Sequence, residues 1–201
     1  MSNADFAIYT VHGMFWGAFG LTRLILRRRD RKDDSVADTA PSSTQETAAP
    51  FSRVLVAFHA FAFGVMYIGV ALAVVPNRVP VWFTNQRAIG AVIIAAAAAL
   101  VVWALVSFRS WRFRAAVDSR HQLATGGPFK LMRHPIYMGL NLLALGSAIW
   151  VPTVIMWSAF VLMAIGSDLR ARAEETLLTK AFGNAYREYF ARTRRFVPGI
   201  Y

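Results

Sequence analysis

The sequence predicts an all-α membrane protein, a polytopic bundle of about five transmembrane helices in a single domain spanning residues 1–201. Hydrophobic residues make up 56% of the 201 residues and charged residues only 16%, which is too apolar for an ordinary soluble domain. The apolar residues form runs comparable in length to the ~20 helical residues that cross a bilayer. These runs are 6–26, 53–75, 88–108, 136–150 and 153–168.

The basic residues predict how these helices are oriented. The formal net charge is +11, and of the 22 Lys and Arg residues only Arg78 and Arg87 lie in the connectors on one side of the membrane. Such a bias marks the cytosolic side, so we expect the N-terminus outside and the C-terminus in the cytosol. Anionic lipid next to a basic cytosolic face accounts for the charge without a nucleic-acid partner.

The first run could be a signal peptide, but its basic cluster follows the apolar residues instead of preceding them, so we interpret 6–26 as a retained helix. Gly13 and Gly17 within it have the spacing that lets two helices approach closely. His12 is expected to form a hydrogen bond between helices. Residues 27–52 combine the basic cluster with a Ser-, Thr-, Ala- and Pro-rich segment, and we predict a disordered cytosolic linker, with a regulatory tail as the alternative.

The third run is followed by residues 109–122, RSWRFRAAVDSRHQ. We expect this segment to extend the third helix into the cytosol. Its arginine side chains can lie along apolar surface while their charged ends reach the headgroups.

The last two runs are separated by Pro152, so they form either one helix of ~32 residues or a helical hairpin. Their combined length and the turn-forming residues at 150–153 favour the hairpin. The fourth helix can begin at Pro135, because proline suits the first helical turn. Residues 170–201 are predicted to form a C-terminal cytosolic amphipathic helix with a bend at Gly183.

Several kinds of site are excluded by residues that are missing. The chain has no cysteine, which excludes a disulfide framework, a thiolate metal site and a cysteine nucleophile. It also lacks a glycine-rich phosphate loop, an HExxH zinc motif and a nucleophile elbow. Polar residues instead gather at the cytosolic ends of the last two runs, where a hairpin would bring them together. One cluster is His121, Gly126, Gly127, Pro128, Phe129, Arg133, His134 and Tyr137, and the other is Arg170, Arg172, Glu174 and Glu175.

Each of these residues taken alone also has a structural interpretation. Arg170 and Glu174 can be an exposed i,i+4 ion pair of little energetic weight. His134 can cap a helix, Arg133 can contact lipid phosphate, and Tyr137 can belong to the interfacial aromatic belt. Physical reasoning alone therefore predicts a membrane bundle with a polar pocket that faces the cytosol.

Three segments in order, GGPFKLMRHPIYMG, RARAEETLL and FGNAYREYFARTRRFVPG, resemble the isoprenylcysteine carboxyl methyltransferase family, which is related to phospholipid and thiol methyltransferases. The resemblance covers about residues 112–199, the expected catalytic half. It implies an integral-membrane enzyme that transfers a methyl group from S-adenosylmethionine to a lipophilic acceptor, here the carboxylate of a prenylcysteine-like molecule. A phospholipid amine, a small thiol and a non-catalytic binding protein are the alternatives.

The resemblance also implies roles for particular residues. Arg170 would orient the methyl acceptor, and Glu174 would pair with the ammonium group of the cofactor. The ring of Tyr137 or Phe129 can lie against the sulfonium cation, although Phe129 stands where the family often has tyrosine. In-line methyl transfer needs no metal, and none is predicted. The cofactor-binding residues implied by position are His121, Gln122, Leu123, Ala124, Phe129, His134, Pro135, Ile136, Tyr137 and Glu174.

Overall fold

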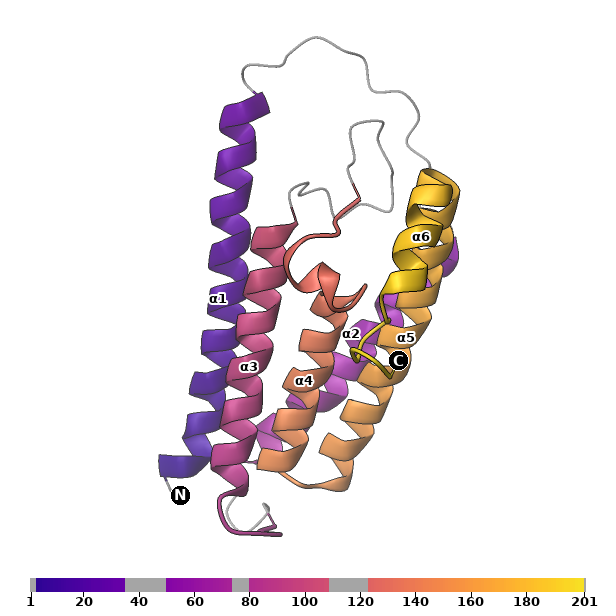
Figure 1. Ribbon diagram of the computed structural model, residues 1–201. Helices are drawn as coiled ribbons and strands as arrows, with labels where there is room; N and C mark the ends of the chain where they lie inside the picture. The colour runs from indigo at the N-terminus through magenta and orange to yellow at the C-terminus, as the bar shows by residue number, and fades with distance from the viewer. Residues whose placement is uncertain (1–2, 35–49, 74–79, 109–122, 201) are drawn as a thin grey trace.

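The computed structural model describes residues 3–34, 50–73, 80–108 and 123–200, and within these ranges the regular structure is entirely helical (Figure 1). The predicted all-α class is therefore confirmed. The elements in chain order are α1 (Asn3–Asp34), α2 (Pro50–Leu72), α3 (Gln86–Ser107), the 3-10 helix η1 (Gly127–Lys130), α4 (Pro135–Trp150), α5 (Val154–Phe182) and α6 (Asn184–Arg192).

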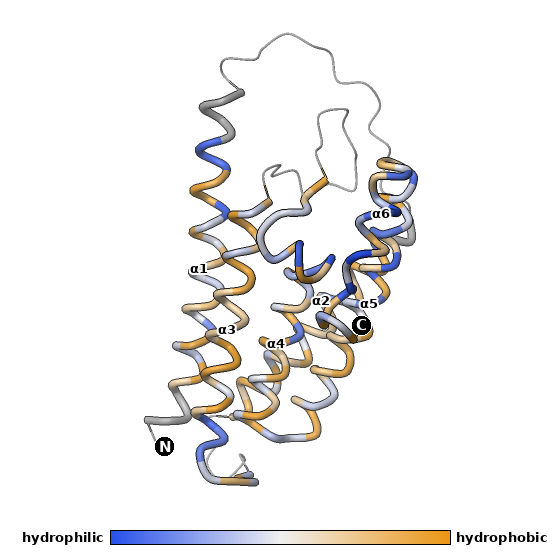
Figure 2. The backbone as a smooth tube through the Cα atoms, viewed as in Figure 1, coloured by the Kyte–Doolittle hydropathy of each residue, from blue (hydrophilic) through white to orange (hydrophobic). Residues whose placement is uncertain are grey.

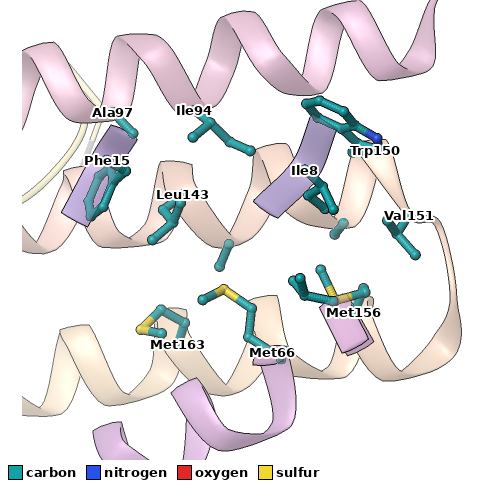
Figure 3. Close-up of a cluster of buried hydrophobic side chains, with 14 of the residues drawn as sticks. Ile8, Phe15, Met66, Ile94, Ala97, Leu143, Trp150, Val151, Met156 and Met163 are labelled. Carbon is teal, nitrogen blue, oxygen red and sulfur yellow. The ribbon is translucent and has the colours of Figure 1, made fainter. Parts of the chain in front are cut away.

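The five long helices surround one apolar core. Helix α1 packs on α3, α3 on α4, α4 on α5, and α5 on α2. Helix α2 returns to α1, where the rings of Phe63 and Trp16 lie 5.6 Å apart. Figure 3 shows Met66 of α2, Leu143 of α4 and Met163 of α5 in the space between their helices, and all three are fully buried.

Three helices are long and apolar enough to cross a membrane: α2 from Arg53, α3, and α5. Helix α4 is apolar but shorter, with 16 residues. Helix α1 does not reach the same apolarity, so only part of the predicted set of five spans meets this criterion in the described residues. Along the bundle the apolar residues occupy the part away from η1 and α6, and hydrophilic residues gather near α6 (Figure 2).

Several predicted boundaries were wrong. Helix α1 continues to Asp34 and α2 begins at Pro50, so the predicted linker 27–52 overlaps both helices, and only 35–49 can still be a linker. That segment and the predicted cytosolic extension 109–122 lie outside the described residues. Helix α1 extends because a helix propagates through polar residues once it has been nucleated by a packed apolar segment.

The fourth helix begins at Pro135, the expected position, with His134 as its N-cap residue. It ends at Trp150, and only three residues separate it from α5, which runs in the opposite direction (Figure 1). The side chain of Thr153 caps α5 by accepting a hydrogen bond from the Met156 backbone N–H at 3.3 Å.

Helix α5 differs from the prediction, which ended the fifth span at residue 168 and started a separate tail helix at 170. It is one continuous helix to Phe182, because no residue between 168 and 182 interrupts the backbone hydrogen bonds. The bend predicted at Gly183 is confirmed: its φ is 55°, in the region that favours glycine. Helix α6 follows directly.

The close helix approach is not where the sequence suggested. A methyl group added at Gly13 or Gly17 of α1 would meet no atom within 4 Å among the described residues. At Gly90 of α3 it would lie 2.6 Å from the carbonyl oxygen of Gly146 in α4, and at Gly146 it would lie 2.8 Å from that of Gly90. The tight contact is therefore between α3 and α4.

The interhelical role predicted for His12 is confirmed. Its Nε2 atom lies 2.9 Å from Ser147 Oγ of α4, and Ser147 in turn donates to the Leu143 carbonyl oxygen at 2.7 Å. On the other side of the ring, Nδ1 lies 3.4 Å from the Tyr67 hydroxyl of α2. This network ties α1, α2 and α4 together inside the bundle.

Candidate functional site

The two predicted polar clusters meet where α4 begins and α5 continues past its apolar part. His134 is the N-cap residue of α4 but makes no side-chain capping bond, and its Nδ1 atom lies 3.6 Å from Glu174 Oε2. Its Nε2 atom lies 3.3 Å from Glu175 Oε1. The two glutamates reach this level because α5 continues without interruption past residue 168, and Arg170 and Glu174, four residues apart, lie on one face of it.

Glu175 is buried, with 6% of its surface exposed, and it is surrounded by cations. Arg133 Nε lies 2.9 Å from its Oε1, and Arg195 approaches both oxygens, at 3.1 Å and 2.7 Å. Arg195 also donates to Asp168 Oδ1 at 2.7 Å. These charge-assisted hydrogen bonds occupy Glu175, so it acts as a structural anchor.

Glu174 has a different environment, although it is the adjacent residue. Its side chain is 40% exposed, and Arg170 Nη2 is 3.8 Å away. The Tyr137 hydroxyl donates to its Oε1 atom. With one hydroxyl donor, a guanidinium at 3.8 Å and the His134 ring at 3.6 Å, this carboxylate keeps acceptor capacity for a cation that approaches from outside.

The ring of Tyr137 is enclosed, with 6% of the residue exposed. It stacks on His134 with ring centroids 5.7 Å apart and lies 5.9 Å from the ring of His59 in α2. The Arg170 guanidinium sits 5.2 Å from its centroid. Tyr137 therefore presents its hydroxyl group to Glu174 while its ring holds the surrounding side chains in position.

Residues 193–197, here called the C-terminal strap, pair with the start of the site. Met132 and Arg194 form an isolated parallel β-bridge. The Arg133 backbone N–H donates to the Arg194 carbonyl oxygen at 2.8 Å, and that of His134 donates to Arg195 at 3.1 Å. The Arg133 guanidinium lies over the Phe190 ring, 3.9 Å from its centroid. The strap thus orients the residues before α4.

The 3-10 helix η1 carries Phe129, of which 6% is exposed. The Tyr189 hydroxyl of α6 donates to its carbonyl oxygen at 2.8 Å, and its ring lies 5.8 Å from that of Phe108. Burial raises the pKa of Tyr189 to about 12, so the hydroxyl stays protonated and can donate at neutral pH. This bond fixes η1 against α6.

Other predicted cofactor-binding residues are distributed around this cluster. Pro135 is buried at the first turn of α4, whereas Ile136 packs against the main apolar core. Leu123 and Ala124 precede η1 and are partly buried. His121 and Gln122 lie outside the described residues. The roles assigned to all these residues stay predictions.

Sequence reasoning missed part of the cluster. Glu175 was placed in it without a role, and Asp168, Arg195 and His59 were not considered. Nothing in their local sequence marks them: Arg195 lies 20 residues from Glu175 in a basic stretch. Arg195 joins the ion pairs of Glu175 and Asp168 only because the C-terminal strap folds back onto α5.

Four buried side-chain polar atoms have no hydrogen-bond partner in the part of the chain that the structure describes, and two of them lie near Glu175. They are His134 Nε2, whose contact with Glu175 lacks hydrogen-bond alignment, and the Tyr186 hydroxyl of α6. Burial and then the neighbouring Glu175 charge raise the pKa of Tyr186. Unpaired buried donors and acceptors of this kind are costly, and a ligand or water can satisfy them.

Comparison with known proteins identifies related sequences. Residues 85–185 match the model of the phospholipid methyltransferase family. Two curated relatives, from Oryza sativa subsp. indica and subsp. japonica, are both named probable protein-S-isoprenylcysteine O-methyltransferase and are 32% identical over 84 residues. These residues are 41% of this chain and 44% of each relative, so the match spans less than half the length of the relatives.

One solved structure shares the fold. The eukaryotic intramembrane Ras methyltransferase ICMT (isoprenylcysteine carboxyl methyltransferase) superposes with a TM-score of 0.63 at 18% sequence identity, over 100% of this chain and 69% of that one. The resemblance that the motifs indicate is thereby confirmed at the level of family and fold.

Proposed function

Because the chain belongs to the phospholipid methyltransferase family, we propose that it is an integral-membrane methyltransferase that uses S-adenosylmethionine and a lipophilic acceptor. The observation that carries the proposal is the contrast between the two adjacent glutamates. Glu175 is saturated by two arginines, whereas Glu174 keeps an accessible carboxylate beside the rings of His134 and Tyr137.

The residues present fit the cofactor. When bound, S-adenosylmethionine supplies an electrophilic methyl group on a sulfonium sulfur, which leaves as a neutral thioether. Glu174 would pair with the ammonium group, and the unpartnered His134 Nε2 would bind a polar group of the cofactor. Segment 121–124, Phe129 and residues 134–137 would line the remaining cofactor surface. Tyr137 would hold Glu174 in place through its hydroxyl group.

Arg170 would orient the acceptor. Its side chain is 28% exposed and lies over the Tyr137 ring, one helical turn from Glu174. A guanidinium binds a carboxylate through two parallel hydrogen bonds. A carboxylate oxygen forms its bond to the methyl carbon without losing a proton, so this chain needs no general base for that acceptor. We therefore propose a prenylcysteine-like carboxylate as the acceptor. Positioning of the two reactants and exclusion of water would accelerate the methyl transfer.

A phospholipid amine is the second candidate acceptor, favoured by the family match itself. An ammonium group must lose a proton before it can accept a methyl group. Glu174 is a carboxylate at the site that can take that proton, but the same residue is proposed to pair with the cofactor. This competition for one side chain makes the carboxylate acceptor the first choice, ahead of amines and small thiols.

We further propose five membrane crossings, with α4 and α5 as a hairpin, the N-terminus outside and the site in the cytosol. The support is the distribution of Lys and Arg along the chain and the concentration of hydrophilic residues near α6 (Figure 2). In this arrangement the site lies where a water-soluble cofactor and a lipid-borne acceptor can both reach it.

The first test is calorimetric titration of the purified protein in detergent with S-adenosylhomocysteine. We expect saturable heat at micromolar to millimolar ligand, the ordinary range for enzyme ligands. A radiolabelled-methyl assay with a farnesylcysteine analogue, phosphatidylethanolamine and a small thiol then identifies the acceptor. If millimolar S-adenosylhomocysteine produces no heat of binding, the proposed enzymatic function is contradicted and a non-catalytic binding protein is favoured.

A further inference from the structure

Polar side chains continue from the site into the apolar part of the bundle, in three pairs across α4 and α5. On α4 they are His134, Tyr137 and Asn141, and on α5 they are Glu174, Arg170 and Ser167. The spacings of three and four residues place each set on one face of its helix. The proposed function uses the first two pairs, and the third pair, Asn141 with Ser167, has no role in it.

The third pair forms a hydrogen-bonded group with His59. Ser167 Oγ donates to Asn141 Oδ1 at 2.8 Å and lies 3.4 Å from His59 Nε2. Because Ser167 donates its single hydroxyl proton to Asn141, a hydrogen bond with His59 requires the histidine tautomer that carries its proton on Nε2. Ser167 and His59 are buried, with 0% and 4% exposed. They therefore fix the orientation of the Asn141 amide.

This orientation leaves the amide nitrogen of Asn141 available. Its oxygen is occupied by Ser167, its side chain is only partly buried, and in the described part of the chain its N–H groups have no hydrogen-bond partner. Unpaired amide N–H groups beside hydrocarbon cost free energy. Polar residues at such depth are expensive and are typical of functional sites.

We propose that Asn141 is a specificity-determining residue that donates a hydrogen bond to a carbonyl oxygen of the methyl acceptor. The inference rests on the proposed function, in which Arg170 holds the reacting carboxylate. Asn141 is four residues beyond Tyr137, which is ~6 Å deeper along the helix. The acceptor is therefore an amphiphile with an amide or ester carbonyl about that far from the methylated carboxylate.

The alternative role for Asn141 is purely structural, as a hydrogen-bonding residue that joins α4 to α5. A structural role would affect all acceptors alike. A recognition role would affect only acceptors that carry the carbonyl. The ratio of kcat/KM between matched acceptors separates the two.

The experiment uses three prenylated carboxylic acids with the same tail, differing at one position that carries a methylene, an amide carbonyl or an ester carbonyl. We expect the wild-type protein to prefer both carbonyl compounds over the methylene compound by roughly tenfold in kcat/KM, the value of one hydrogen bond. The substitution Asn141→Leu should reduce this ratio to about one. If the larger leucine side chain lowers the yield of folded protein, Asn141→Ala can replace Asn141→Leu in this experiment.

Ser167→Ala is the matched control, because it removes the same Asn141–Ser167 bond but keeps the amide. It should lower the thermal unfolding midpoint in detergent as Asn141→Leu does. The acceptor preference should fall, because the amide is no longer held in one orientation, but it should stay above one, because the amide can still donate. Equal turnover of the three acids by the wild type, or an unchanged preference in Asn141→Leu, would overturn the inference. No methylation of any acid, together with no S-adenosylhomocysteine binding, would overturn the proposed function as well.

Discussion

The pair Glu174 and Glu175 shows how neighbouring identical residues take different roles. Both side chains project from α5 near the start of α4. Consecutive residues are separated by about 100° around a helix, so Glu175 faces Arg133 and Arg195, whereas the side chain of Glu174 is 40% exposed. Charge alone does not distinguish them, and the difference comes from which cations surround each carboxylate.

Exchange of each glutamate for glutamine tests this division of roles. Glu174→Gln removes the charge proposed to pair with the cofactor ammonium, so S-adenosylhomocysteine affinity should fall by at least tenfold, since hydrogen bonds to charged groups contribute ~1.5–3 kcal/mol. The unfolding midpoint should change little. Calorimetric titration and a thermal unfolding scan in detergent measure the two effects.

Glu175→Gln is the control for the same chemical change at the next position. It leaves two arginines with a neutral partner, and breaking a buried ion pair costs about 3 kcal/mol or more, so the midpoint should fall. Arg170→Ala should weaken acceptor binding far more than cofactor binding. If Glu174→Gln and Arg170→Ala both have small effects on binding, the two residues are a surface ion pair.

At the scale of the elements, the contact between α3 and α4 positions the site. Gly90 and Gly146 let the two backbones approach until each would place a methyl group within 2.8 Å of the other's carbonyl oxygen. Because His134 and Tyr137 are at the beginning of α4, any displacement of α4 from α3 moves them relative to Glu174 on α5. Gly90 and Gly146 therefore affect the geometry of the site although they lie far from it.

Alanine substitutions test the position of the close contact. Gly90→Ala forces the backbones apart, and overpacking of this kind costs about 1–3 kcal/mol, so the unfolding midpoint in detergent should fall. Gly13→Ala on α1 meets no atom within 4 Å among the described residues and should be neutral or slightly stabilising. Equal losses from both substitutions would show that α1 also makes a close contact.

For the whole molecule, the distribution of charge predicts the orientation in the membrane. Only Arg78 and Arg87 fall on the side opposite to the remaining Lys and Arg residues. In the described structure, hydrophilic residues gather near α6 (Figure 2), as expected if that end of the bundle faces water. The polar site then opens to the cytosol, where the proposed cofactor would be available.

A reporter fused after Tyr201 tests this orientation. We expect cytosolic activity from it, and activity on the opposite side of the membrane from a reporter inserted near Arg78, because the positive-inside bias is strong. A reporter that is active outside the cytosol when fused after Tyr201 would reverse the arrangement and would separate the site from a cytosolic cofactor.

The helical class, the approximate apolar segments and the two polar clusters could be predicted from the amino-acid sequence. Hydropathy and helical spacing are local properties, so a continuous apolar run or a proline such as Pro135 can be interpreted without knowing its neighbours. The motifs around His134 and Glu174 indicated the family for the same reason. Boundaries failed in α1 and α5, where polar residues continue a helix that the apolar pattern had ended.

Which residues contact one another could be seen only in the folded chain. Gly90 with Gly146, Arg195 with Glu175, and His59 with Ser167 are contacts between separate parts of the chain; the last pair is 108 residues apart. Such contacts depend on how helices cross and rotate, and hydropathy does not encode either. For that reason Glu175 became an anchor, Glu174 the proposed ligand-binding carboxylate, and Asn141 a candidate for recognising the acceptor only once α2, α4 and α5 were packed together.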